Sequence, residues 1–124
     1  MRVLLIDDLD SITFLLSTWL RAHGYETQEV NDSRFALAAA REFHPDVILL
    51  DIAMPHLSGY DVARAIRADE LMANVPIIAV TAFDSATRRS QARDAGIDHQ
   101  VTKPCSLPDL LILLGEVLNP SPTP

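Results

Sequence analysis

The sequence is poor in cysteine and in long apolar runs. Its only cysteine, Cys105, cannot form a disulfide within the chain, which favours a reducing compartment. The longest unbroken aliphatic run is Leu110 to Leu114. A signal peptide needs an apolar stretch of roughly 7–15 residues, and a membrane span needs about 20. We therefore expect a cytoplasmic protein with no membrane insertion.

Positive charge is also scarce. Ten lysines and arginines stand against 17 aspartates and glutamates, for a formal net charge of -7, and no run of basic residues interrupts the sequence. Such a chain repels the phosphate backbone of nucleic acids, so no direct nucleic-acid binding is expected. What is present is typical of a globular domain: apolar residues make up 48% of the 124 residues, enough for one hydrophobic core.

Short apolar runs alternate with helix-length segments. The runs lack polar alternation, which is typical of strands buried on both faces. Strands are predicted at 3–6, 47–50 and 77–80, with weaker candidates at 27–30 and 99–101, and helices at 11–23, 34–43, 60–69, 86–95 and 107–118. Five such units predict an α/β fold: a doubly wound five-stranded parallel sheet, strand order 2-1-3-4-5, with five helices on both faces. Residues 1–118 would form this domain, and the proline-punctuated 119–124 a tail or linker.

Polar side chains follow the predicted strands where each strand ends. Asp7 and Asp8 follow the first strand, Asp51 the third, Thr81 the fourth and Lys103 the fifth. Ligands of open parallel sheets bind beyond these ends, where the strand order reverses. Three carboxylates brought together there would repel one another and raise the pKa of at least one. A Mg²⁺ ion, which prefers oxygen ligands and bridges carboxylates to phosphate, would remove that repulsion.

Phosphoryl transfer requires a nucleophile and positive charge around the transferred group. Asp51 is the best candidate for the nucleophile, forming an aspartyl phosphate, because Asp7 and Asp8 would be occupied with the metal. Lys103 and Thr81 would contact the phosphoryl oxygens. Each of these residues alone is more often a helix cap or a solvated surface group. Their joint position after successive strands favours a site.

At this point the chain resembles the receiver domain of two-component response regulators. The motifs that carry the resemblance are Val3-Leu-Leu-Ile-Asp-Asp8, Asp51-Ile-Ala-Met-Pro55 with Ser58-Gly59, Val80-Thr-Ala82, Ala95-Gly-Ile-Asp98 and Lys103-Pro104. The resemblance implies a flavodoxin-like fold and phosphorylation of Asp51 by a sensor histidine kinase or a histidine phosphotransfer protein. It implies a signalling domain that changes conformation to control an output, and that catalyses only its own Mg²⁺-dependent phosphorylation and dephosphorylation.

The resemblance also implies how the metal is held. Asp8 and Asp51 would bind Mg²⁺ directly, Asp7 through water, and Ala53 through its backbone carbonyl, with Mn²⁺ as an acceptable substitute. The peptide bond that precedes Pro104 would be cis.

Several positions depart from the family pattern. Gln100 stands where an aromatic residue usually moves inward on activation. Ala53 and Phe83 flank the expected phosphoryl group, and neither side chain can orient a water molecule, so we hypothesise that hydrolysis of the aspartyl phosphate is not fast. The predicted last helix is apolar all around at 110–114. Either it is deeply buried, or it docks a second copy or an effector.

Three other functions are less consistent with the sequence. A phosphatase of the haloacid dehalogenase family would usually carry a second aspartate at position 53, where this chain has alanine. A flavin-binding module would need a phosphate loop rich in small residues after the first strand, where this chain has Asp7, Asp8 and Asp10. A pseudo-receiver that never takes phosphate would have no need of the whole set of polar residues.

Overall fold

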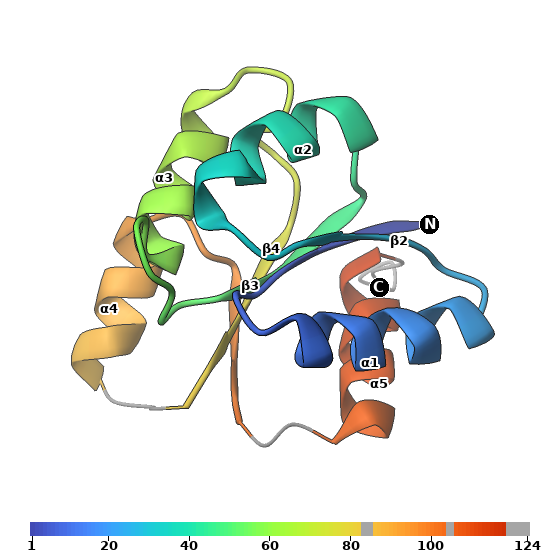
Figure 1. Cartoon of the computed structure of the whole chain (residues 1–124). Coiled ribbons are helices and arrows are strands. Elements are labelled where there is room, and N and C mark those ends of the chain that lie inside the picture. The colour runs from blue at the N-terminus through green and yellow to red at the C-terminus, as the bar shows by residue number, and fades with distance from the viewer. Residues whose placement is uncertain (83–85, 104–105, 119–124) are drawn as a thin grey trace, which may run out of the picture.

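The structure is a computed structural model that describes residues 1–82, 86–103 and 106–118 (Figure 1). The strands are β1 (Arg2–Ile6), β2 (Glu26–Val30), β3 (Val47–Asp51), β4 (Ile77–Thr81) and β5 (His99–Thr102). The helices are α1 (Asp10–Ala22), the 3₁₀ turn η1 (Ser33–Phe35), α2 (Ala36–Phe43), α3 (Gly59–Ala68), α4 (Ala86–Asp94) and α5 (Leu107–Leu118). All strand pairs are parallel, in the order β2-β1-β3-β4-β5. The predicted fold class and strand order are confirmed.

The core has two halves, one on each face of the sheet. Figure 1 shows α2, α3 and α4 on one side of the strands and α1 and α5 on the other. Successive strand residues point to opposite faces, so Leu4 and Ile6 pack toward the first group while Val3 and Leu5 pack toward the second. This two-sided burial is the physical reason for the unbroken apolar runs in the sequence.

Helix ends follow local signals in the sequence. Gly24 and Gly96 have φ of 90° just after α1 and α4, the left-handed backbone that glycine adopts without strain. Ser58 and Asp61 form a capping box that starts α3 directly after the loop that follows β3. The predicted helix from residue 34 is divided, because the Asp32 carboxylate caps the backbone N–H of Arg34 and starts η1 first.

Arg67 of α3 ties together segments that are far apart in sequence. Its guanidinium donates to the carbonyls of Gly96 at 2.8 Å and Val75 at 2.6 Å. It also donates to the Asp98 carboxylate at 2.6 Å, and the same carboxylate oxygen accepts the backbone N–H of Ile77 at 2.8 Å. Arg67 thus connects α3 to the segments that lead into β4 and β5.

The last helix buries one face only. Leu110 and Leu114 of α5 are buried against the sheet, whereas Ile112 is 60% exposed. The apolar run at 110–114 is therefore explained in large part by burial, and a docking role for this helix stays a prediction. No helix in the described part of the chain has the length and apolar character needed to span a membrane. The expected tail at 119–124 lies outside the described residues.

Candidate functional site

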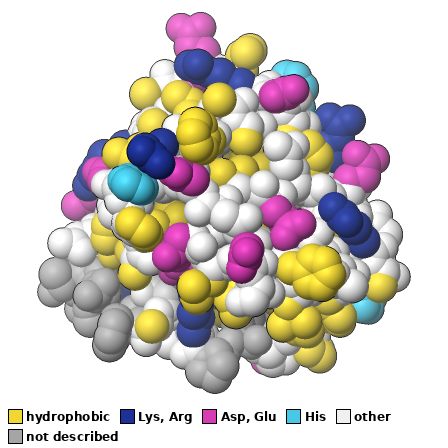
Figure 2. Space-filling view, viewed as in Figure 1, with side chains coloured by type: hydrophobic (Ala, Val, Ile, Leu, Met, Phe, Trp, Pro, Cys, Tyr) yellow, Lys and Arg dark blue, Asp and Glu magenta, His cyan; other side chains and the backbone are white. Residues whose placement is uncertain are grey.

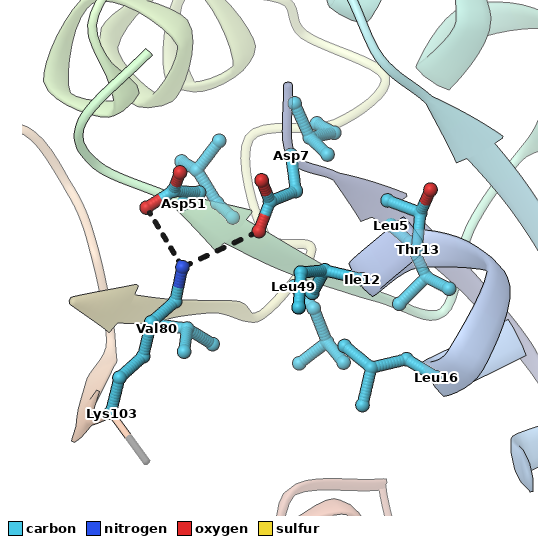
Figure 3. A pocket seen from close by; sticks show the side chains of 11 residues that line it. Leu5, Asp7, Ile12, Thr13, Leu16, Leu49, Asp51, Val80 and Lys103 are labelled. Atoms are coloured by element: carbon cyan, nitrogen blue, oxygen red, sulfur yellow. Dashed lines mark hydrogen bonds and ion pairs between the residues drawn. The ribbon is translucent and has the colours of Figure 1, made fainter. Parts of the chain in front are cut away.

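The register of the strands brings the predicted site residues to one edge of the sheet. Ile6 of β1 pairs with Leu50 of β3, so the residues that follow them, Asp7 and Asp51, are neighbours. Figure 3 shows the ammonium of Lys103 between these two carboxylates. Its Nζ lies 3.5 Å from Asp7 Oδ2 and 3.6 Å from Asp51 Oδ1. Both aspartates are buried, each residue being 7% exposed, so their charges are largely shielded from water.

The third carboxylate completes an oxygen-lined cluster. One carboxylate oxygen each from Asp7, Asp8 and Asp51 lies within 4.8 Å of the others. Thr81 is buried at the end of β4, and the backbone N–H of Lys103 donates to its carbonyl at 2.7 Å. The structure therefore brings together all five residues that the sequence singled out at the strand ends.

Short loops fix the directions of the two buried carboxylates. Asp7 Oδ1 accepts the backbone N–H of Leu9 at 3.0 Å, and Asp51 Oδ1 accepts the backbone N–H of Ala53 at 3.4 Å. Gly59, the first residue of α3, donates its N–H to the Ile52 carbonyl at 2.9 Å. The start of α3 is thereby held directly against the strand end that carries Asp51.

Electrostatics make the cluster costly to ionise completely. The pKa of Asp51 is raised above its ordinary value, first by burial and then by the negative charge of Asp7. The ammonium of Lys103 acts in the opposite direction. The sequence predicted a raised pKa from repulsion between carboxylates. The direction is confirmed, but loss of hydration on burial is the larger cause.

The donor set fits a hard divalent cation. The cluster of Asp7, Asp8 and Asp51 offers carboxylate oxygens alone, which are the ligands that Mg²⁺ prefers. The negative charge of Asp7, which raises the pKa of Asp51 in addition to the larger effect of burial, would be offset by a bound cation. These three residues would hold the ion, and when bound it would neutralise charge on the carboxylates and on a transferred phosphoryl group.

Comparison with known proteins assigns this arrangement to a family. The family model for the response regulator receiver domain matches residues 3–114. This chain belongs to that family. Receiver domains are signalling domains that bind Mg²⁺ in an acidic pocket and interact with histidine kinases or phosphotransfer proteins. The assignment excludes the flavin-binding and haloacid dehalogenase interpretations.

Relatives cover the receiver domain at moderate identity. The polar-differentiation response regulator DivK of Brucella ovis is 37% identical over 106 residues, which are 86% of this chain and 86% of DivK. The DNA-binding dual master transcriptional regulator RpaA of Synechocystis is 34% identical over 118 residues, which are 95% of this chain but only 49% of RpaA. The receiver domain thus matches one nearly whole regulator and about half of a longer one.

Solved structures of receiver domains superimpose closely on this chain. The chemotaxis protein CheY4 of Vibrio cholerae has a TM-score of 0.90 and 32% identity, covering 94% of this chain and 98% of CheY4. The receiver domain of the sensor histidine kinase PA1611 of Pseudomonas aeruginosa has a TM-score of 0.86 and 32% identity, covering 94% and 96%. That structure has a magnesium ion coordinated in its active-site cleft.

The remaining positions singled out in the sequence lie partly outside the described residues and partly on β5. Phe83 and Pro104, with the expected cis bond, lie outside the described residues. Gln100 lies on β5, and its side-chain Nε2 is buried without a hydrogen-bond partner in the described part of the chain. Sequence reasoning missed Asn31 and Thr13, which hydrogen-bond around Asp7. The only signal in the sequence was a polar residue directly after the second strand.

Proposed function

We propose that this receiver domain accepts a phosphoryl group on Asp51 from a phosphohistidine, in a reaction that depends on Mg²⁺. The observation that carries the proposal is the position of the Lys103 ammonium. It lies between Asp7 and Asp51, at 3.5 Å and 3.6 Å, beside a cluster of three carboxylates. A partly buried ammonium group and a cluster of carboxylates that can hold a metal, next to one carboxylate, are what an in-line phosphoryl transfer to that carboxylate requires.

Each residue has a separate part in the transfer. A carboxylate oxygen of Asp51 attacks phosphorus, and the bond between phosphorus and the histidine nitrogen breaks. Its electron pair stays on the imidazole, which takes a proton from solvent. The ammonium of Lys103 is close enough to Asp51 to pair with the oxygens of a phosphoryl group bound there. Thr81 is the last residue of β4, at the same end of the strands. Asp7, Asp8 and Asp51 would hold the metal, with the Ala53 carbonyl as the proposed further ligand.

We predict that acetyl phosphate with Mg²⁺ will add one phosphoryl group to the chain, and that Asp51→Asn will abolish the addition completely. The reason is that a carboxamide cannot serve as the nucleophile. Intact mass spectrometry measures the result. Asp109→Asn, an exposed aspartate in the first turn of α5, is the matched control and should be phosphorylated like the unchanged chain. Phosphorylation of Asp51→Asn at the normal level would contradict the assignment, and no addition to the unchanged chain would favour a pseudo-receiver.

An uncharged surface beside the site supports docking of a protein partner there. Five exposed positions of α1, spaced three and four apart, carry no charge: they are Ser11, Phe14, Leu15, Thr18 and Ala22. The exposed charged residues of this helix, Asp10 and Arg21, lie in its first and last turns. Phe14 is 67% exposed and Leu15 is 56% exposed. Figure 2 shows hydrophobic side chains gathered over α1 at the lower right of the view. In a chain with a net charge of -7, such a helix face suits an apolar face of the phosphodonor.

We predict that Phe14→Ser will slow phosphotransfer from a histidine kinase or phosphotransfer protein at least about tenfold, because truncated aromatic anchors commonly cost more than about 1.4 kcal/mol of binding energy. Phosphorylation by acetyl phosphate should stay unchanged, since the small donor does not need the surface. Phe35→Ser is the control. Phe35 is 62% exposed but follows β2 on the side of the sheet covered by α2. Equal slowing by both substitutions would exclude α1 as the docking surface.

A further inference from the structure

The side chain of Asn31 connects three elements around the first aspartate of the site. Its Nδ2 donates to the backbone carbonyl of Asp7 at 2.9 Å and to Thr13 Oγ1 at 2.8 Å. The Thr13 hydroxyl in turn donates to the carbonyl of Asp10 at 3.1 Å. Asn31 follows the end of β2, and Thr13 lies in the first turns of α1, where it is 1% exposed. The network therefore links β2, the end of β1 and α1.

These bonds complete the restraint on Asp7. Its backbone N–H donates to the Val30 carbonyl at 3.1 Å, and its carboxylate Oδ1 accepts the N–H of Leu9 at 3.0 Å. With its carbonyl held by Asn31, the one remaining polar atom is Oδ2, the oxygen that faces Lys103. Figure 3 shows Thr13 and Asp7 on neighbouring walls of the same pocket.

We propose that Asn31 and Thr13 are positioning residues for the metal site, which together fix the direction of the Asp7 carboxylate and so set the affinity for Mg²⁺. The inference rests on the Mg²⁺-dependent function proposed above and adds two residues to it. Groups that orient metal ligands by hydrogen bonds commonly change metal affinity about 10–100-fold when they are removed. Neither residue touches the metal or the phosphoryl group, so their action is through Asp7.

A second hydrogen bond between the same two elements supplies a control. Ser17 Oγ and Thr27 Oγ1 are 2.6 Å apart and join α1 to β2, as Thr13 and Asn31 do. Ser17 is also 1% exposed. This pair makes no hydrogen bond to Asp7 among the described contacts, so its loss should affect the attachment of α1 without redirecting the carboxylate.

The experiment measures the Mg²⁺ affinity of the whole unphosphorylated chain by isothermal titration calorimetry, with thermal unfolding recorded for each variant. Thr13→Val and Asn31→Leu keep nearly the shape of each side chain and remove its hydrogen bonds. Each is expected to raise the Kd for Mg²⁺ about tenfold. Thr13→Ser, which restores the hydroxyl, and Ser17→Ala should stay within about twofold of the unchanged chain. The double variant should bind no more weakly than about the worse single variant, since the two residues act in one network.

The outcomes separate the two proposals. If the unchanged chain binds no Mg²⁺, the proposed function itself fails. If it binds Mg²⁺ and Thr13→Val and Asn31→Leu bind equally well, only the positioning role is excluded. If Ser17→Ala lowers the Mg²⁺ affinity as much as Thr13→Val does, the positioning role is also excluded, because a general loosening of α1 would then be the cause. Should Asn31→Leu fail to fold, the comparison of Thr13→Val with Thr13→Ser decides alone.

Discussion

Gly59→Ala is expected to lower the free energy of unfolding by about 3 kcal/mol, at the upper end of the range for overpacked substitutions. A Cβ at this position would lie 2.6 Å from the carbonyl oxygen of Asp51 and 2.7 Å from Cα of Ile52. Both atoms belong to the backbone of the strand end that carries the proposed phosphoacceptor, so neither can turn away. Either α3 or that strand end must shift, and phosphorylation from acetyl phosphate should fall as well.

Gly115→Ala is the matched control for this substitution. Gly115 lies within α5, and an added Cβ there would meet no atom within 4 Å. Alanine stabilises a helix by about 0.5–1 kcal/mol relative to glycine, so this variant should be slightly more stable than the unchanged chain. Urea denaturation followed by circular dichroism measures both. A Gly59→Ala variant as stable as Gly115→Ala would show that the close approach of α3 to Asp51 is not tight.

Arg67→Met is expected to lower the free energy of unfolding by about 2–4 kcal/mol. The substitution preserves an apolar stem of similar length but removes every hydrogen bond of the guanidinium. The carbonyls of Gly96 and Val75 lose the guanidinium donor, and Asp98 loses that ion pair while keeping its bond from the backbone N–H of Ile77. Buried acceptors left without partners cost about 1–3 kcal/mol each. The Gly96 and Val75 carbonyls are only partly buried and the Asp98 side chain is 45% exposed, so each contributes less than this full cost.

Arg64→Met provides the comparison on the same helix. Arg64 pairs with Asp61 at 3.3 Å, but the two side chains are 57% and 50% exposed. Ion pairs of this kind contribute about 0–1 kcal/mol, so the variant should unfold close to the unchanged chain. Arg67→Lys should lie between the two, since an ammonium cannot reproduce the fork of donors. Equal stability of the two methionine variants would mean that Arg67 contributes no more than a surface pair.

The sequence predicted the layered fold because strand burial leaves a direct mark on it. The runs that became β1, β3 and β4 are apolar on both faces, and the glycines at 24 and 96 mark the ends of helices. The strands at the two edges of the sheet, β2 and β5, carry more polar side chains and were weaker candidates. The predicted topology is the one observed, and solved receiver domains superimpose closely on it.

The site was predictable as far as it depends on strand ends. Asp7 and Asp51 meet because parallel strands in register finish at one edge, which a sequence pattern can indicate. The hydrogen bonds of Arg67 could not be predicted, because this side chain binds mainly backbone carbonyls, and carbonyls leave no mark in a sequence. Those of Asn31 could not be predicted either, because they depend on how close the folded chain brings it to the Asp7 carbonyl and the Thr13 hydroxyl. The dominance of burial over repulsion at Asp51 likewise depends on packing that only the folded chain defines.

The distance between the two ends of the strands has a practical use in protein engineering. All of the proposed chemistry lies where the strands finish, whereas the turn between α1 and β2 lies where a strand begins. At Gly24 an added side-chain atom would meet nothing within 4 Å. A reporter peptide or a second protein module spliced into this turn would sit a full strand length away from the acidic cluster. Fusions for following activation in living cells can therefore be built there without touching the reacting groups.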